Sequence, residues 1–133
     1  EGFSFNFEAG KKYKVDLLGT VTTTVVTTGV SIGFYLPNGM GIISGFLQIA
    51  VNSAATATAL IAAIYSINQT PTTIGSSATS TGITPINTPT YFQASLIFIP
   101  VTNGVFQMQF GSEIATSPAK LNAGSTMMIE EIE

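Results

Sequence analysis

The segment from Ala94 to Ile132 constrains the fold of this chain more than any other part. Large apolar side chains alternate with polar ones at its centre, where Phe106, Met108 and Phe110 stand beside glutamines. A period of two residues is that of a β-strand, whose successive side chains point to opposite faces of a sheet. The segment therefore predicts strands rather than helices.

Turns of small residues delimit the predicted strands of this segment. Asn103-Gly104 predicts a tight hairpin turn, because both residues readily take the positive φ angles that such a turn needs. After a connection at Gly111–Leu121, the small residues Ala123-Gly124-Ser125 lead into a closing strand that we expect to end at Ile132.

The first part of the chain also predicts short strands. Phe3, Phe5 and Phe7 alternate with polar residues, and the next strand alternates from Tyr13 until Gly19, which we expect to interrupt it. Turn residues and β-branched residues predict the other strands. These are Val21–Thr28, Val30–Leu36, Phe46–Val51 and Tyr91–Ile99.

The middle of the chain is less definite. Ala54–Ala63 is rich in alanine and could form a helix, but its threonines and the β-branched residues that follow favour a strand. Gln69–Thr90 is dominated by Thr, Ser, Gly and Pro, which predicts a long surface loop. Ile74, Ile83 and Ile86 are the loop's apolar anchors.

Charge is scarce and unevenly distributed. Charged residues make up 8% of the chain, the net charge is −3, and none lies between Leu17 and Ser112. The absence of Arg and the negative net charge argue against nucleic-acid binding. The apolar window Val30–Val51 contains Pro37-Asn38-Gly39, which fits two strands better than a membrane-spanning helix. We therefore expect no membrane insertion.

Length and composition predict one domain over residues 1–133 with a substantial core, since 45% of the residues are hydrophobic. The sequence begins at Glu1 rather than Met, so we expect it to be part of a longer or processed chain. Eight to ten short strands, roughly, separated by turns and without confident helices, predict an all-β antiparallel sandwich or barrel.

Catalysis is not expected. The chain has no His and no Cys, which removes the commonest general base and the best nucleophile. Asp16 stands alone between two apolar residues, and a Lys120–Ser125 dyad has a simpler reading as a solvated lysine and a turn serine. We expect no cofactor and no metal.

Two clusters of charge have simple interpretations. The acids of the C-terminus, Glu130, Glu131 and Glu133, could hold a hard cation near a symmetry axis, but a frayed, solvated terminus is favoured. The lysines of the 11–14 segment could attract an anionic surface, although a solubilising sheet edge is favoured.

Three stretches carry a resemblance to a known family. They are Phe-x-Phe-x-Ala-Gly-Lys-x-Tyr-x-Val-x-Leu-Leu (5–18), Asn-Gly-x-Phe-x-Met-x-Phe (103–110) and Leu-x-Ala-Gly-Ser-x-x-x-Ile (121–129). Together they resemble the tumour necrosis factor/complement globular-head type of jelly roll, as found in bacteriophage head-decoration and tail-fibre proteins. The chain departs from the animal members in its low charge and its lack of Trp.

The resemblance implies an antiparallel jelly-roll sandwich that forms a homotrimer packed around aromatic residues, with a structural or receptor-binding role on a virion. The alternating stripes are most simply core, and we expect part of them at a subunit interface. The candidate core or trimer-interface residues are Phe98, Phe106, Met108, Phe110 and Met127.

Two functions follow as expectations. The first is a non-enzymatic virion protein, a trimeric capsid-decoration or head-fibre module on the particle surface that contacts other virion proteins; depletion of charge is typical of permanent interfaces. The alternative is the tip domain of a tail fibre, which binds a host glycan or protein through the Gln69–Thr90 loop. The candidate partner-binding residues are Thr72, Thr73, Ser76, Ser77, Thr79, Ser80 and Thr81.

Overall fold

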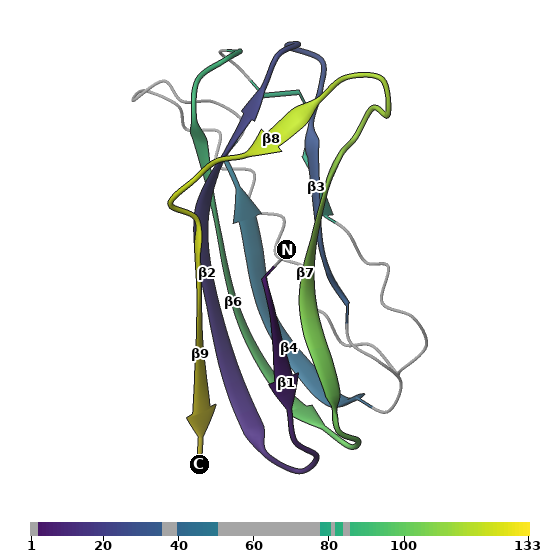
Figure 1. The fold of residues 1–133 in the computed structure, drawn as a ribbon, viewed down its shortest axis with the longest axis vertical. Helices are drawn as coiled ribbons and strands as arrows, with labels where there is room; N and C mark the ends of the chain where they lie inside the picture. The colour runs from purple at the N-terminus through teal and green to yellow at the C-terminus, as the bar shows by residue number, and fades with distance from the viewer. Residues whose placement is uncertain (1–2, 36–39, 51–77, 81, 84–85) are drawn as a thin grey trace.

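The regular structure of this chain is β-strand throughout the part that the computed structural model describes, residues 3–35, 40–50, 78–80, 82–83 and 86–133 (Figure 1). The antiparallel all-β prediction is therefore confirmed there. The strands are β1 (Ser4–Phe7), β2 (Lys12–Thr23), β3 (Val30–Tyr35), β4 (Met40–Ile49), β5 (Ala78–Thr79), β6 (Thr90–Pro100), β7 (Gly104–Ser112), β8 (Ala119–Leu121) and β9 (Thr126–Ile132).

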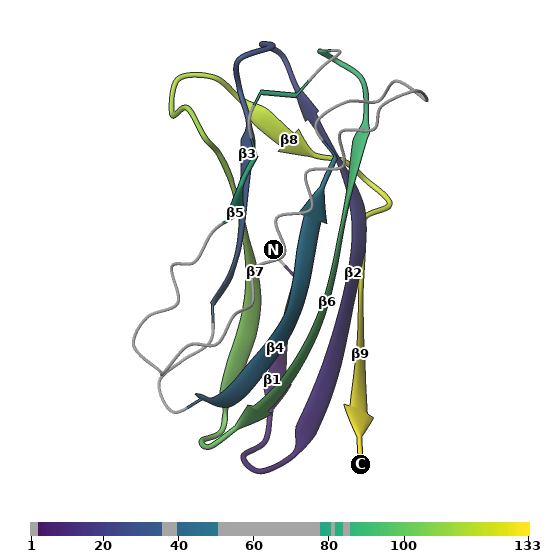
Figure 2. The same cartoon turned by 180° about the vertical axis from the view of Figure 1, so that it is seen from behind.

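The strands form two sheets that face each other, as Figures 1 and 2 show from opposite sides. Sheet A has the order β1-β7-β3-β5, and sheet B has the order β4-β6-β2. Both β8 and β9 pair with β2, so that they share its second edge in sheet B. Every pairing is antiparallel, which gives a two-layered sandwich.

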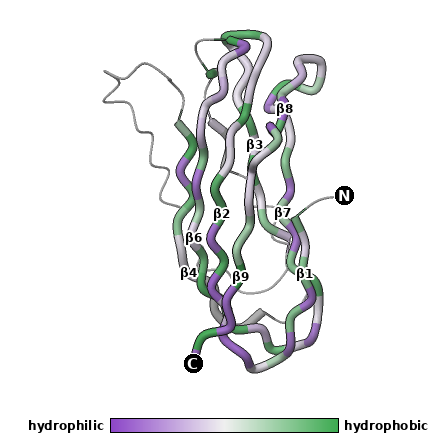
Figure 3. Tube along the Cα trace, turned by 60° about the vertical axis from the view of Figure 1, so that its left-hand side comes forward, coloured by the Kyte–Doolittle hydropathy of each residue, from purple (hydrophilic) through white to green (hydrophobic). Residues whose placement is uncertain are grey.

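Alternation along the strands builds the core between the sheets. In Figure 3 the hydropathy changes along the strands of both sheets, as expected when alternate side chains face inward. Aromatic rings fill the centre: Phe98 of β6 stacks on Tyr13 of β2 at 5.4 Å and on Phe106 of β7 at 5.6 Å between ring centroids. The Phe98–Phe106 contact joins the two sheets, whereas Tyr13 and Phe98 pack side by side within sheet B.

Strand β2 corrects two sequence predictions. Gly19 does not interrupt it, because β2 continues to Thr23 and Gly19 itself pairs with Phe92 of β6. An ideal Cβ at Gly19 would lie 2.6 Å from the Phe92 ring, so glycine there leaves space for a core side chain. The predicted strand Val21–Thr28 was also wrong beyond Thr23, where the chain turns and the amide of Thr28 donates to the Val25 carbonyl.

The turn after β6 differs from the predicted tight hairpin. Neither Asn103 nor Gly104 has a positive φ angle; among the described residues, Gly10, Gly45, Asn87 and Gly124 do. The side chain of Asn103 accepts a hydrogen bond from the amide of Ala9 at 2.8 Å. Its role is therefore to hold the β1–β2 turn against the β6–β7 turn, a contact between segments distant in sequence.

The C-terminal strand is paired rather than frayed. β9 runs beside β2 from Thr126 to Ile132, so the expectation of a frayed terminus was wrong. β9 and β6 also flank β2 on both sides, so Lys12 and Lys14 lie on an interior strand and not on the sheet edge that the sequence suggested. Lys11 pairs with both Glu8 and Glu131, each at 3.1 Å.

A short turn separates β8 from β9, and Asn122 fixes it to β2. Its Nδ2 donates to the hydroxyls of Thr20 and Thr22, and its backbone amide donates to the Thr20 carbonyl at 2.9 Å. Gly124 follows with a φ of 87°. Ser125 Oγ accepts from the Thr20 amide and donates to the Asn122 carbonyl, so this serine holds the turn.

The strand-or-helix alternative for Ala54–Ala63 and the turn at Pro37-Asn38-Gly39 lie outside the described residues. No helix long and apolar enough to cross a membrane is found among the residues that the structure describes.

Candidate functional site

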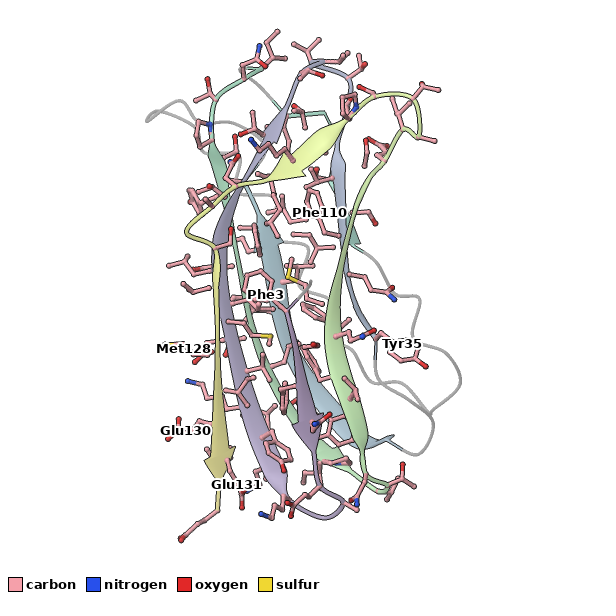
Figure 4. All side chains as sticks on the ribbon, viewed as in Figure 1. Phe3, Tyr35, Phe110, Met128, Glu130 and Glu131 are labelled. Carbon is pink, nitrogen blue, oxygen red and sulfur yellow. The ribbon has the colours of Figure 1, made fainter. Side chains whose placement is uncertain are left out.

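The candidate interface residues lie in or against the core of the chain itself. Phe98 and Phe106 are fully buried, and Met108 is 8% exposed. Phe110 and Met127 are partly buried and pack against the same core, and Figure 4 shows Phe110 between the sheets. Three of the five candidates therefore contribute most of their surface to the sandwich, and Phe110 and Met127 keep some surface for a partner.

Two of the candidate loop residues are described. Thr79 belongs to β5 and pairs with Ser31 of β3. Ser80 is buried, its Oγ accepts from the amide of Val30, and its own amide donates to the Val30 carbonyl. Ser80 therefore anchors this segment to sheet A. The remaining candidates lie outside the described residues: Thr72, Thr73, Ser76, Ser77 and Thr81.

The outer face of sheet B carries a different candidate site, which the sequence did not indicate. The strand registers place Phe46 of β4 opposite Ser95 of β6, Ser95 opposite Asp16 of β2, and Asp16 opposite Met128 of β9. Partners in antiparallel strands point to the same face of the sheet. These four side chains therefore form one row across the outer face, and Figure 4 shows Met128 on that outer side.

The next row deepens this surface into a groove. It consists of Gln48, Gln93, Leu18 and Thr126 from the same four strands. The groove has a volume of about 330 Å³ and is lined by Leu18, Phe46, Gln93 and Met128, together with Asp16, Ser95 and Thr126. Leu18 is 57% exposed and Met128 66%, so two large apolar side chains stand open to solvent there.

Asp16 is the charged group at the centre of the groove. The Lys14 ammonium lies 2.7 Å from Asp16 Oδ2, and Ser95 Oγ donates to Asp16 Oδ1 at 2.6 Å. The bond from Lys14, followed by the bond from Ser95, holds the pKa of the Asp16 carboxyl below its usual value. The same contact raises the pKa of Lys14. At neutral pH the two residues form an ion pair without net charge.

Amide groups extend the polar floor of the groove. Gln93 Nε2 donates to Gln48 Oε1 at 2.8 Å, which orients both side chains along the outer face. A second hollow of about 450 Å³ shares Asp16 and Met128 with the groove and extends to Glu130 of β9. A carboxylate, amides and a hydroxyl thus lie between apolar side chains, an arrangement that can hydrogen-bond and contact a ligand at once.

In the part of the chain that the structure describes, the groove does not contain a cluster of side chains that could bind a metal ion. Among the described residues, no group of three or more His, Cys, Asp or Glu side chains could hold a metal ion.

The groove could be found only in part from sequence. Alternation places Asp16 and Leu18 on one face of their strand, Gln93 and Ser95 on one face of theirs, and Phe46 with Gln48 likewise. Which strands are neighbours, and in which register, depends on pairings between residues far apart in the chain. That information is absent from the local pattern.

Comparisons with known proteins add no identification, because no protein-family model, curated protein or solved structure matches the chain. The family resemblance of the sequence motifs stays a prediction.

Proposed function

We propose that the chain is a non-enzymatic assembly module, a jelly roll that forms a homotrimer and decorates or stabilises the surface of a virion beside other virion proteins. The nested order of the strands supports the jelly-roll part of the proposal. β1 pairs with β7, β2 with β6, and β3 with β5, so strands pair from the two ends of this segment toward its middle. A long hairpin rolled into two sheets has this nesting, which is the principle of the jelly roll.

Surface composition supports an assembly role. Apolar side chains are exposed on both outer faces: Tyr35 and Val105 on sheet A, and Leu18, Tyr91 and Ile97 on sheet B. Exposed apolar side chains on a surface with little charge are compatible with contacts to partners. Figure 4 shows Tyr35 directed away from the sandwich, where another subunit could contact it.

Sedimentation equilibrium at micromolar concentration tests the trimer. We expect three times the 13.9 kDa mass of one chain. Tyr35→Glu should dissociate the trimer if aromatic residues of sheet A form its interface, whereas Tyr91→Glu on sheet B serves as a matched control and should not. A wild-type chain that sediments as a monomer would remove the main support for the proposal.

Particle labelling tests the virion setting separately. Antibodies against the chain should label intact particles by electron microscopy in a virus preparation from the source organism. Labelling confined to the soluble fraction, with particles unlabelled, would contradict a place on the virion.

A second candidate, the receptor- or glycan-binding tip of a tail fibre, has support from the groove on sheet B rather than from the Gln69–Thr90 loop. Loop residues Ser80 and Ile83 are buried and serve the fold, whereas Ile86 and Asn87 of the same loop are exposed.

A further inference from the structure

The groove on sheet B has the chemical character of a site for an amphipathic ligand. Phe46 forms one wall, and Leu18 and Met128 form the other. Between them lie the side chains of Asp16 and Gln93, together with other polar groups of the two inner strands. A ligand that fills the groove would therefore place polar edges against the floor and apolar faces against the walls.

Hydrogen-bonding capacity remains at the centre of the groove. A carboxylate has about four lone-pair positions. Lys14 and Ser95 each occupy one position on Asp16, on different oxygens. Hydroxyl donors of a ligand can use the others. The bond between Gln93 and Gln48 employs one amide hydrogen and one carbonyl lone pair, so these amides also retain donors and acceptors.

Charge balance restricts the ligand further. Asp16 is the sole ionisable side chain among the residues that line the groove, and Lys14 neutralises it. The lining itself leaves no unbalanced charge for an ion, and Glu130, which faces Lys14 beside the groove, further disfavours an anion. A neutral ligand with many hydroxyl donors matches the ionised Asp16, whose charge Lys14 balances.

We propose that this groove binds a neutral sugar ring of a glycan. Ring hydroxyls donate to the Asp16 carboxylate and exchange hydrogen bonds with the amide of Gln93, and the apolar face of the ring rests on Phe46. The volume of about 330 Å³ lies at the lower end of the range for small-ligand sites, which suits a short glycan segment. This proposal needs neither the trimer nor the virion setting.

The test is ligand-observed NMR on the full chain with the methyl pyranosides of glucose, galactose, mannose and N-acetylglucosamine at millimolar concentration. At least one should bind. Phe46→Ala and Asp16→Asn should each weaken binding by about tenfold, the effect of a contact of roughly 1.4 kcal/mol. The controls, Val101→Ala at a 60% exposed position after β6 and Glu8→Gln in the β1–β2 turn, should bind as the wild type does.

Three results would overturn the proposal. They are absence of binding by all four pyranosides, unchanged affinity in both groove variants, and dissociation of a wild-type oligomer by Phe46→Ala, which would identify a second copy as the occupant of this face. Met128→Ala, at a 66% exposed position, provides a groove variant that should fold even where another does not. A monomeric wild type that binds a pyranoside would refute the trimer and support the groove.

Discussion

Asp16 shows how one residue acquires its role from its neighbours across a sheet. In the sequence it stands between Val15 and Leu17 without a recognisable motif. In the structure it joins Lys14 of its own strand and Ser95 of the adjacent strand. Its lowered pKa has two causes that mutation can separate.

The pKa of Asp16 should respond more strongly to Lys14 than to Ser95. We expect Lys14→Met to raise the carboxyl pKa further than Ser95→Ala does, because the lysine bond is the larger cause. The chemical shift of the Asp16 carboxyl carbon, measured as a function of pH, gives the titration midpoint in each variant. Equal midpoints in the wild type and in Lys14→Met would contradict the assignment.

The same carboxylate predicts a pH dependence of stability. Because folding lowers its pKa, the stability that ionised Asp16 contributes is complete above the ordinary carboxyl pKa and is lost as the pH falls through the lower folded value. Urea unfolding at several pH values should show that the free energy of unfolding falls less at acidic pH in Asp16→Asn than in the wild type. An identical fall in the two proteins would count against the prediction.

Gly19 is the clearest steric constraint at the residue scale. Gly19→Ala should destabilise the chain by about 1–3 kcal/mol, because the new methyl group would collide with Phe92 and Ser125. Gly111→Ala is the matched control, since a Cβ there meets no atom within 4 Å. Urea midpoints measure both. Similar losses in the two variants would show that strand propensity rather than crowding governs Gly19.

At the element scale, the turn between β8 and β9 decides how sheet B ends. Asn122 connects this turn to Thr20 and Thr22, so one side chain sets the register of two short edge strands against β2. Without such a fixed point, edge strands are prone to slip.

Asn122→Ala should therefore destabilise the chain by about 1–2 kcal/mol, the loss expected for hydrogen bonds that are partly buried. Asn6→Ala is the control, because Asn6 is exposed on β1. Amide hydrogen exchange should accelerate along β9 in the Asn122 variant. Unchanged exchange in β9 would mean that the strand holds its place without the turn.

At the scale of the whole molecule, inward and outward aromatic residues have different tasks. Phe98 is fully buried between the sheets, whereas Phe46 is 38% exposed on the groove. The first joins the layers, and the second is available to a partner.

Unfolding measurements should separate these tasks. Phe98→Ala should cost about 3–5 kcal/mol, the range for deletion of a buried aromatic side chain. Phe46→Ala should cost clearly less, because 38% of its surface is already exposed to solvent. A loss for Phe46→Ala as large as that for Phe98→Ala would show that the groove wall is part of the core.

The sequence by itself determined three stretches of strand and their inward faces. Alternation at Phe3–Phe7, Tyr13–Leu17 and Val105–Phe110 predicts them because side-chain direction in a strand depends on position alone. Only the tertiary structure decided that β2 passes through Gly19, that Asn103 joins two turns, and that Asp16 meets Phe46, Ser95 and Met128 in one row. Each of these depends on registers between distant segments, which local periodicity does not encode.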